Sequence, residues 1–554
     1  MNWGFNTSIR KSTSRSNNDR NRRNFGLQNS AILEGAMNAA TIEDMVRSHA
    51  RLHAQYPCVT FDEVTLTYQD MDRRSNAVAN GLLAEGCVAG DRIGVVDKNG
   101  FPIFETLFGA RKMGVVQVAV NWRLAAPEMA YILGDSDVKI LFVQTEFFAH
   151  LAKIKDQLPS VRKIIAIGDH PDYENYKDWI ARQKAEDTGY SSGPEDTCLQ
   201  LYTSGTTGRP KGTLLCNRNI LSFIEAATQT FGVFESSAHL NCLPLFHVGG
   251  MVWSLFCMSQ GGHCVGTREF DAAKLIEYFA KYKITHGMTV PAVIQMLLAV
   301  PAARTTDFSN LRGITYGGSP ISEKVLIDAL QTFKCGMYGM YGATEVSFGL
   351  TILTPEEHDP VNRPELLKSV GKALKGTEMK IVDPISLEEV VGETVGEVWI
   401  RSPSVSIGYW KKEQETATVF RADGWFRSGD LGYYKNGFLY LHDRLKDMIV
   451  TGAENVYPAE VERVILQHPD VTQAAVIGIP DDVWGEAVKA IIVPVSDATA
   501  TEGEIKAFCR ERLAGYKCPK TIEFVDALPM TPSGKIIKHE LRKTYWENRA
   551  RQIN

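Results

Sequence analysis

The sequence predicts an α/β protein with a large N-terminal domain of helix-flanked sheets plus a small β-rich subdomain, followed by a small α+β C-terminal domain. The chain has 554 residues, which is too long for one ordinary core and suggests about three or four structural units. Short apolar runs alternate with helical patterns over most of the chain, which is typical of parallel sheets covered by helices. From about Glu378 the pattern changes to closely spaced strands.

The elements of the first half follow in a regular order. Residues 68–86 show the apolar spacing of a helix and end at Gly86. Strands are expected at 92–97, 115–120, 139–144, 163–168 and 198–204. Beyond a Gly-rich segment, helices are expected at 271–283, 291–300 and 321–333, with strands between them at 284–290 and 311–318. Pro291 suits the first turn of its helix.

The β-rich region begins with strands at 378–384 and 396–402. In 432–444 the dipeptide Asn436-Gly437 separates two aromatic-rich runs, which is a strong hairpin signal. The last hundred or so residues mix a helix at 457–469 with strands at 473–479 and 489–495. We therefore divide the chain into 1–36, a disordered basic extension with few apolar residues; 37–445, the large domain; and 446–554, the small domain. A transit peptide, or an extension upstream of a start at Met37, are alternative interpretations of the first segment.

Composition excludes several classes of function. The chain is 44% hydrophobic and 23% charged with a net charge of −5, which gives no indication of a nucleic-acid partner. Ten scattered cysteines without C-x-x-C spacing favour a reduced, cytoplasmic chain without structural metal. No apolar run is long enough to form a transmembrane segment. The sequence is compatible with peripheral contact with a membrane and with formation of a homodimer.

Residues 202–213 read YTSGTTGRPKGT and follow an apolar strand. Gly205 and Gly208 allow close approach of backbone N–H groups to a ligand, and Arg209 and Lys211 add positive charge. The segment therefore favours an anion, most plausibly phosphate, over a purely structural loop. It lacks the G-x-x-x-x-G-K-[ST] spacing of a Walker A loop.

Seven separate segments together resemble the core motifs of the adenylate-forming superfamily, which includes acyl-CoA synthetases, luciferases and peptide-synthetase adenylation domains. The segments are 202–212, 243–250, 316–322, 340–345, 424–432, 443–462 and 529–541. They occur in the family's order, and the resemblance covers about residues 40 to 545. It implies that a carboxylic acid reacts with ATP to give an acyl-adenylate and pyrophosphate, and that a thiol then displaces AMP. ATP, Mg²⁺ and coenzyme A are the implied small molecules.

The resemblance also implies roles for residues of the ATP site. The segment that wraps the phosphates would include Thr203, Ser204, Gly205, Thr206, Thr207, Gly208 and Lys211, with Gly318 also at the nucleotide. Lys535 would bridge carboxylate and phosphate during adenylation, Glu345 would bind Mg²⁺, and Thr344 would touch the α-phosphate. Asp430 would accept both ribose hydroxyls, with Arg444 nearby, and Tyr341 would stack on adenine.

His247 would lie between the acyl site and the path of the CoA arm, and is the fourth catalytic candidate beside Lys535, Glu345 and Thr344. The acyl-pocket candidates are His247, Val248, Gly249, Gly317, Tyr338 and Gly339. Lys446 matches the family's hinge, which makes the small domain mobile, and Gly452 would lie beside the passing thiol.

The preferred function is an AMP-forming acyl-CoA ligase for a medium- or long-chain fatty acid, because residues 121–139 resemble bacterial fatty acyl-CoA ligases. An aromatic or alicyclic acid, as in 4-coumarate and feruloyl ligases, is the main alternative. Val248 stands where amino-acid-activating domains generally have Asp, which disfavours an amino acid substrate. A luciferase, a non-catalytic homologue that binds acyl or nucleotide ligands, and a P-loop kinase or ATPase are further alternatives.

Overall fold

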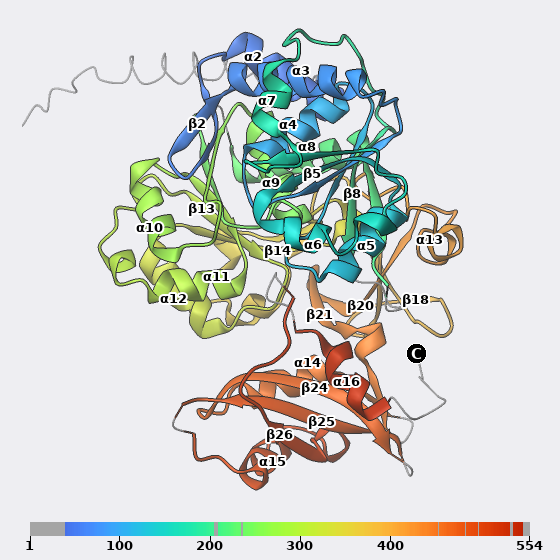
Figure 1. Cartoon of the computed structure of the whole chain (residues 1–554). Helices are drawn as coiled ribbons and strands as arrows, with labels where there is room; N and C mark the ends of the chain where they lie inside the picture. Colours follow the sequence, from blue (N-terminus) through green and yellow to red (C-terminus); the bar gives the residue numbers. More distant parts are fainter. Residues whose placement is uncertain are drawn as a thin grey trace, which may run out of the picture.

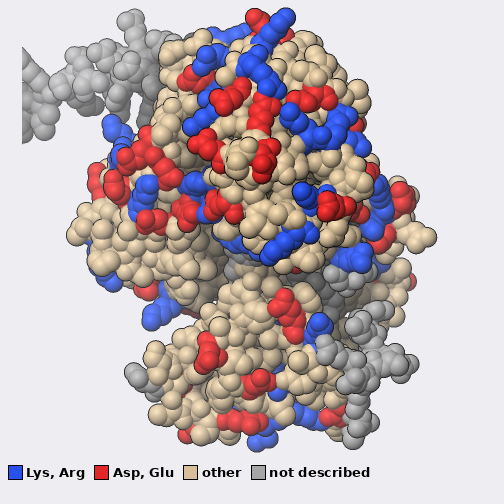
Figure 2. Space-filling view, viewed as in Figure 1, with Lys and Arg blue, Asp and Glu red and all other residues tan. Residues whose placement is uncertain are grey.

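The computed structural model describes residues 39–203, 209–233, 236–451, 454–481, 484–496, 498–531 and 536–546. The large domain occupies the upper part of Figure 1, and the strands that follow residue 449 form a smaller body below it. Within the described residues, no helix is both long and apolar enough to cross a membrane. Figure 2 shows acidic and basic side chains interspersed on the visible face, which does not carry the one-sign patch expected for binding a polyanion.

A seven-stranded sheet carries most of the strands expected before residue 204. Its order is β7 (Glu174–Asn175), β6 (Lys163–Ile167), β5 (Val138–Gln144), β3 (Arg92–Val96), β4 (Val116–Ala119), β8 (Thr197–Thr203) and β9 (Lys211–Cys216). All neighbours are parallel except β8 and β9, which pair antiparallel. The Gly-rich segment therefore joins two antiparallel strands, and Thr203 is the cross-strand partner of Lys211.

A nine-stranded sheet forms the second half of the large domain. Its order is β16 (Lys372–Ala373), β15 (Thr351–Leu353), β14 (Gly336–Tyr341), β13 (Gly313–Gly317), β12 (His286–Thr289), β10 (Ala238–Asn241), β11 (His263–Gly266), β1 (Pro57–Phe61) and β2 (Val64–Thr67). The pairs from β14 to β1 are parallel, whereas β15, β16 and β2 at the two ends pair antiparallel.

Helices fill the space between these sheets and cover their outer faces (Figure 1). One hydrophobic cluster joins both sheets through α2 (Ile42–Leu52), α3 (Tyr68–Ala84), α4 (Phe101–Arg111), α7 (Tyr176–Ala181), α8 (Asn217–Phe231) and α9 (Val248–Ser259). A second cluster packs α10 (Ala272–Lys281), α11 (Pro291–Ala299) and α12 (Glu323–Phe333) on the nine-stranded sheet. A third packs α5 (Ala126–Asp135) and α6 (Phe148–Leu151) on the seven-stranded sheet. Helix α9 is apolar on all sides because it lies inside the first cluster.

The β-rich subdomain is a five-stranded antiparallel sheet with the order β18 (Glu389–Val390), β17 (Glu378–Val382), β19 (Gly396–Arg401), β20 (Phe426–Lys435) and β21 (Phe438–Arg444). The predicted hairpin is confirmed between β20 and β21. Asn436 and Gly437 both have positive φ, 52° and 80°, as a two-residue turn of the I′ type requires. Helix α13 (Glu413–Val419) lies between β19 and β20 in the chain.

The last body is a sheet of β23 (Glu454–Val456), β22 (Ile449–Thr451), β25 (Gly485–Pro494) and β24 (Val471–Asp481), with β26 (Thr521–Phe524) also paired to β25. Its helices are α14 (Pro458–Ile465), α15 (Glu502–Arg510) and α16 (Lys538–Trp546). A separate hydrophobic cluster lies within this body, as expected for an independent core.

Candidate active site

Glu345 lies at the centre of the candidate site, in the single turn Thr344–Val346 that follows β14. Its Oε1 accepts a hydrogen bond from Thr203 Oγ1 at 3.1 Å and a second from the Tyr409 hydroxyl, also at 3.1 Å. The end of β8, the turn after β14 and the segment after β19 therefore meet at one carboxylate. Both donors bind the same oxygen, so the two hydroxyls fix the orientation of the carboxylate group.

Lys211 stands on the other side of Tyr409. Its ammonium lies 5.0 Å from the centre of the Tyr409 ring, and only 9% of the residue is exposed. The backbone holds Tyr409 there, because Trp410 N donates to Gly212 O at 2.8 Å and Leu214 N donates to Gly408 O at 3.0 Å. A cation and a carboxylate thus flank one tyrosine at the base of the Gly-rich segment.

The Tyr409 hydroxyl acts as a proton donor. Burial, and then the negative charge of Glu345, raise the pKa of Tyr409 well above its ordinary value. The phenol consequently stays protonated at physiological pH and keeps its hydrogen bond to the carboxylate.

The predicted adenosine-binding residues also lie together. Tyr341 ends β14, and its hydroxyl donates to Asp430 Oδ2 at 2.6 Å. Asp430 is the cross-strand partner of Arg444 between β20 and β21. Gly318 follows β13 with φ of +81°, a conformation that favours glycine.

The predicted acyl-pocket residues belong to the start of α9 and to strands β13 and β14 of the nine-stranded sheet. His247 is the residue that precedes α9, and its ring lies 4.6 Å from that of Phe246. Val248 packs against the first hydrophobic cluster, and Tyr338 packs on Phe231 with ring centres 4.8 Å apart. A Cβ added at Gly317 would lie 2.4 Å from Met340 O, so no larger residue fits without movement of the backbone.

Gly249 and Gly339 differ in the direction that a side chain would take. A Cβ at Gly249 would lie 3.5 Å from the Phe348 ring, inside the first cluster. A Cβ at Gly339 would instead lie 3.0 Å from the Tyr316 hydroxyl, which belongs to the cluster on the opposite face of the sheet. Strand alternation therefore turns Gly339 away from the face that carries Tyr338, contrary to the expectation that both line one pocket.

Ser347 and Phe348, which follow Glu345 in the chain, adopt backbone conformations that are rare for residues other than glycine. Ser347 has φ of 64° and Phe348 has φ of 154°. Such positions cost about 1–3 kcal/mol each and persist where surrounding contacts impose them. Here the Ser347 hydroxyl donates to Ser404 O at 2.8 Å, and the Phe348 ring packs on Phe223.

Several predicted site residues belong to parts of the chain that the structure does not describe. Ser204, Gly205, Thr206, Thr207, Gly208, Gly452 and Lys535 lie outside the described residues, as do the side chains of Arg444 and Lys446. Among the described residues, no group of three or more His, Cys, Asp or Glu side chains is arranged to hold a metal ion. One oriented carboxylate fits Mg²⁺ nevertheless, because this ion is commonly held by one or two carboxylates together with substrate phosphates.

The sequence did not reveal Tyr409. Its hydroxyl contacts a carboxylate 64 positions away, and nothing in the pattern SIGYW indicates which side chain it meets. The positive φ values of Ser347 and Phe348 were equally hidden, because neither is the Gly or Asn that usually marks such a conformation.

Comparisons with known proteins agree with this geometry. Residues 46–410 match the AMP-binding enzyme family, and 460–535 match the AMP-binding enzyme C-terminal domain. The fatty acid–[acyl-carrier-protein] ligase ScoC of Streptomyces coeruleorubidus is 36% identical over 520 residues, covering 93% of this chain and 98% of that protein. Feruloyl-CoA synthase of an Amycolatopsis species is 35% identical over 504 residues, covering 90% and 97%.

A solved structure shows the same overall fold. The fatty acyl CoA synthetase of Mycobacterium tuberculosis superposes with a TM-score of 0.74 at 31% identity, covering 91% of this chain and 98% of that one. The family match spans more than half of the chain, and the relatives cover nearly all of it. The protein therefore belongs to the AMP-binding enzyme family, that is, to the adenylate-forming superfamily.

Proposed function

We propose that the protein is an ATP-dependent, AMP-forming acid-thiol ligase that converts a carboxylic acid to its acyl-CoA thioester. One observation carries the proposal: Thr203 and Tyr409, from separate segments, donate to the same oxygen of Glu345, and the Lys211 ammonium lies 5.0 Å from the centre of the Tyr409 ring. The pair Tyr341–Asp430 supports a nucleotide near this carboxylate, because Tyr341 ends β14 and Glu345 lies in the turn that follows that strand. Such a site suits a triphosphate beside an acyl group.

In the first step a carboxylate oxygen attacks the α-phosphorus of ATP, and the bond to the bridging oxygen of pyrophosphate breaks. Two anions approach each other, so cations and oriented N–H groups lower the barrier. We assign Lys535 to the bridge between carboxylate and phosphate, Thr344 to the α-phosphate, and Lys211 with the Gly-rich segment to the leaving pyrophosphate. Mg²⁺ held by Glu345 would neutralise phosphate charge.

In the second step the sulfur of CoA, having lost its proton, attacks the acyl carbonyl carbon, and AMP leaves with the electrons of the broken C–O bond. A rotation at Lys446 would withdraw Lys535 and bring Gly452 beside the thiol. His247 would line the route by which the thiol arrives. We accordingly keep 37–445 as the large domain, 446–554 as the mobile domain and 1–36 as a separate extension.

The acid is proposed to be a medium- or long-chain fatty acid. Support comes from ScoC and from the M. tuberculosis synthetase, both named for fatty acids. Feruloyl-CoA synthase favours an aromatic acid as the second candidate. ScoC also makes a carrier protein a second candidate for the thiol, because its name specifies an acyl-carrier-protein acceptor.

A cytoplasmic location is part of the proposal. All ten cysteines lie in the described part of the chain and none forms a disulfide there, which fits a reducing compartment.

The test is an acid panel with ATP, Mg²⁺ and either CoA or a phosphopantetheinylated carrier protein, with AMP, pyrophosphate and thioester measured separately. We expect AMP and thioester with one class of acid. Lys535→Ala is expected to lose adenylation while still converting supplied acyl-adenylate to thioester. Formation of ADP, or absence of pyrophosphate with every acid, would refute the proposal.

A further inference from the structure

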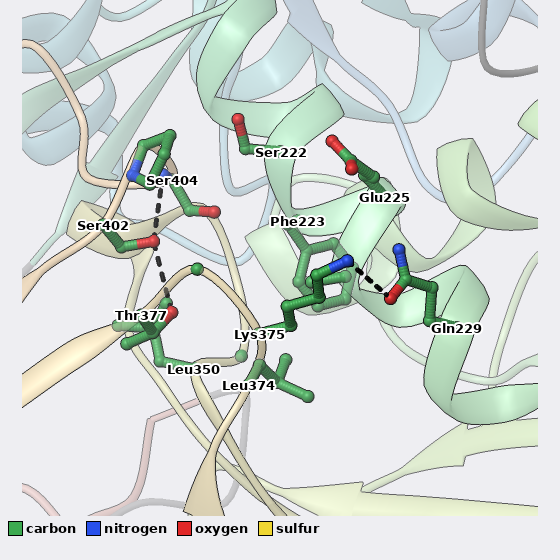
Figure 3. Close-up of a pocket in the computed structure, with 14 residues that line it drawn as sticks. Ser222, Phe223, Glu225, Gln229, Leu350, Leu374, Lys375, Thr377, Ser402 and Ser404 are labelled. Carbon is green, nitrogen blue, oxygen red and sulfur yellow. Dashed lines mark hydrogen bonds between the residues drawn. The ribbon is translucent and has the colours of Figure 1, made fainter.

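A cavity of about 120 Å³ lies between the outer face of α8 and the segments that enter and leave the β-rich subdomain (Figure 3). Buried Phe223, Leu350 and Leu374 give it an apolar base. This volume holds several water molecules and is enough for the end of a chain and a small polar group.

Two packed aromatic rings connect this cavity to Gly249 of the predicted acyl pocket. Phe223 lines the cavity, and its ring packs edge-on against Phe348 with centres 5.0 Å apart. The Phe348 ring also lies 3.5 Å from the Cβ position of Gly249, a predicted acyl-pocket residue. An acyl chain that passes Gly249 therefore meets Phe348 and Phe223 next, and a rotamer change of Phe223 would open the way to the cavity.

The rim of the cavity is polar. The Lys375 ammonium lies 3.2 Å from Gln229 Oε1, and in the described part of the chain no carboxylate pairs with it. On the opposite side of Figure 3, Ser402 Oγ accepts from Thr377 Oγ1 at 3.2 Å and from Ser404 N at 3.3 Å. Because Ser402 accepts both bonds, its own O–H remains a donor.

The charged side chains on the rim favour some chemical groups over others at the far end of a bound acid. Lys375 disfavours a cation, and Glu225, which also lines the cavity, opposes the attraction of Lys375 for a second carboxylate. An uncharged hydroxyl group can accept a hydrogen bond from Lys375 or Ser402 and can also donate one to an oxygen of the rim. A plain hydrocarbon end satisfies none of these groups.

We propose that this cavity is the far end of the acyl site and that it receives the hydroxylated end of the acid. The substrate class is thus a carboxylic acid with an uncharged hydroxyl at its distal end. Phe223 is a specificity-determining residue at the entrance to the cavity, and Lys375 is a binding residue. The inference rests on the proposed ligase function and specifies its substrate.

The test compares three series of straight-chain acids of increasing length, ending in a methyl, a hydroxyl or a second carboxyl group. Pyrophosphate release and thioester formation give kcat/KM for each acid. Beyond the length that reaches the cavity, we expect the hydroxyl-ended acid to exceed its methyl-ended counterpart by about tenfold, the ratio that corresponds to roughly 1.4 kcal/mol. The carboxyl-ended acid is expected to be the poorest.

Substitutions distinguish a specific loss of selectivity for the hydroxyl end from a general loss of activity. Lys375→Met is expected to bring the ratio of hydroxyl-ended to methyl-ended acid close to one, because it removes the donor but keeps the length of the side chain. Lys435→Met is the matched control, since Lys435 is a similarly exposed lysine that pairs with Glu393 on the same subdomain. Phe223→Trp is expected to abolish turnover of long acids and to retain short ones.

A binding measurement supplies a readout that does not depend on turnover. Non-hydrolysable sulfamoyl analogues of the hydroxyl-ended and methyl-ended acyl-adenylates are titrated by calorimetry, and the same ratio is expected in Kd. Equal kcat/KM for the two series, or a ratio unaffected by Lys375→Met, would overturn this inference while leaving the ligase function intact. Failure of every acid to release pyrophosphate would overturn both.

Discussion

Tyr409→Phe removes one oxygen atom from the candidate site and leaves the ring in place. The lost group is the hydroxyl that donates to Glu345 Oε1 at 3.1 Å, while Thr203 continues to donate to the same oxygen. We expect the carboxylate to lose part of its fixed orientation, because one of two donors remains. The ring contacts with Phe420 and with the Lys211 ammonium are retained.

The expected magnitude follows from the type of hydrogen bond. A bond to a charged group contributes about 1.5–3 kcal/mol, and the partial exposure of this one places it near the lower end. A loss of about 1.4 kcal/mol corresponds to a tenfold weaker affinity. Residues that orient a metal ligand typically change metal affinity by about 10–100-fold, so the two estimates agree.

The assay is calorimetric titration of a non-hydrolysable ATP analogue at several Mg²⁺ concentrations. Tyr409→Phe should raise the Mg²⁺ concentration required for half-maximal tight binding about tenfold and should change metal-free binding little. Tyr440→Phe is the matched control, because that hydroxyl donates to the Glu365 carbonyl instead. An unchanged Mg²⁺ requirement, or equal weakening with and without Mg²⁺, would refute the idea that Tyr409 orients Glu345.

Other variants test the remaining parts of the site and the core. Tyr341→Phe, which removes the 2.6 Å bond to the ribose-binding candidate, should raise KM for ATP about tenfold with little change in KM for the acid, and an unchanged KM for ATP would contradict that placement. Gly317→Ala should destabilise the fold by about 1–3 kcal/mol in urea unfolding because its Cβ would lie 2.4 Å from Met340 O, whereas Gly515→Ala, with open space around it, is the control. Burial lowers the pKa of His286 to about 4, so the unfolded chain binds a proton between pH 6.5 and 4 that the folded chain excludes. The contribution of His286 to stability should therefore decrease as the pH falls through this window, by about 2 kcal/mol at pH 5, and the decrease in His286→Gln should be smaller by that amount, with the remainder coming from other buried histidines such as His263.

Local patterns predicted most of the fold. The hairpin at Asn436-Gly437 follows from two adjacent residues that tolerate positive φ, and the structure confirms both values. The runs at 92–97 and 139–144 became β3 and β5 because parallel strands covered on both faces are almost entirely apolar. The turn and the two strands can be predicted from the sequence because each depends on residues that are adjacent in the chain.

Pairing between distant strands was less predictable. The segment Lys211–Cys216 forms β9 and returns antiparallel beside β8, which the sequence analysis did not assign. An edge strand of six residues carries no marker of its partner, since register is fixed by contacts formed only in the folded chain. Without β9, the cross-strand pairing of Thr203 with Lys211 could not be foreseen.

The candidate site shows the same limit at the level of side chains. Motif residues such as Glu345 and Asp430 were found because their chemistry recurs at fixed places in recognisable segments. Tyr409 was not predicted, because its hydrogen bond to Glu345 joins two distant segments and is not indicated by its neighbours in the chain.

The turn after Glu345 also limits where substrate preference can vary. Glu345 faces Thr203 and Tyr409, whereas the ring of Phe348, three positions later, lies against Gly249, a proposed acyl-pocket residue. Between these contacts, Ser347 and Phe348 both have positive φ. A substitution at Phe348 would therefore alter a strained backbone that also positions the carboxylate. Phe223 meets the same ring from α8, a regular helix that carries no such constraint. A change in acyl preference without loss of adenylation is thus expected through α8 rather than through the turn.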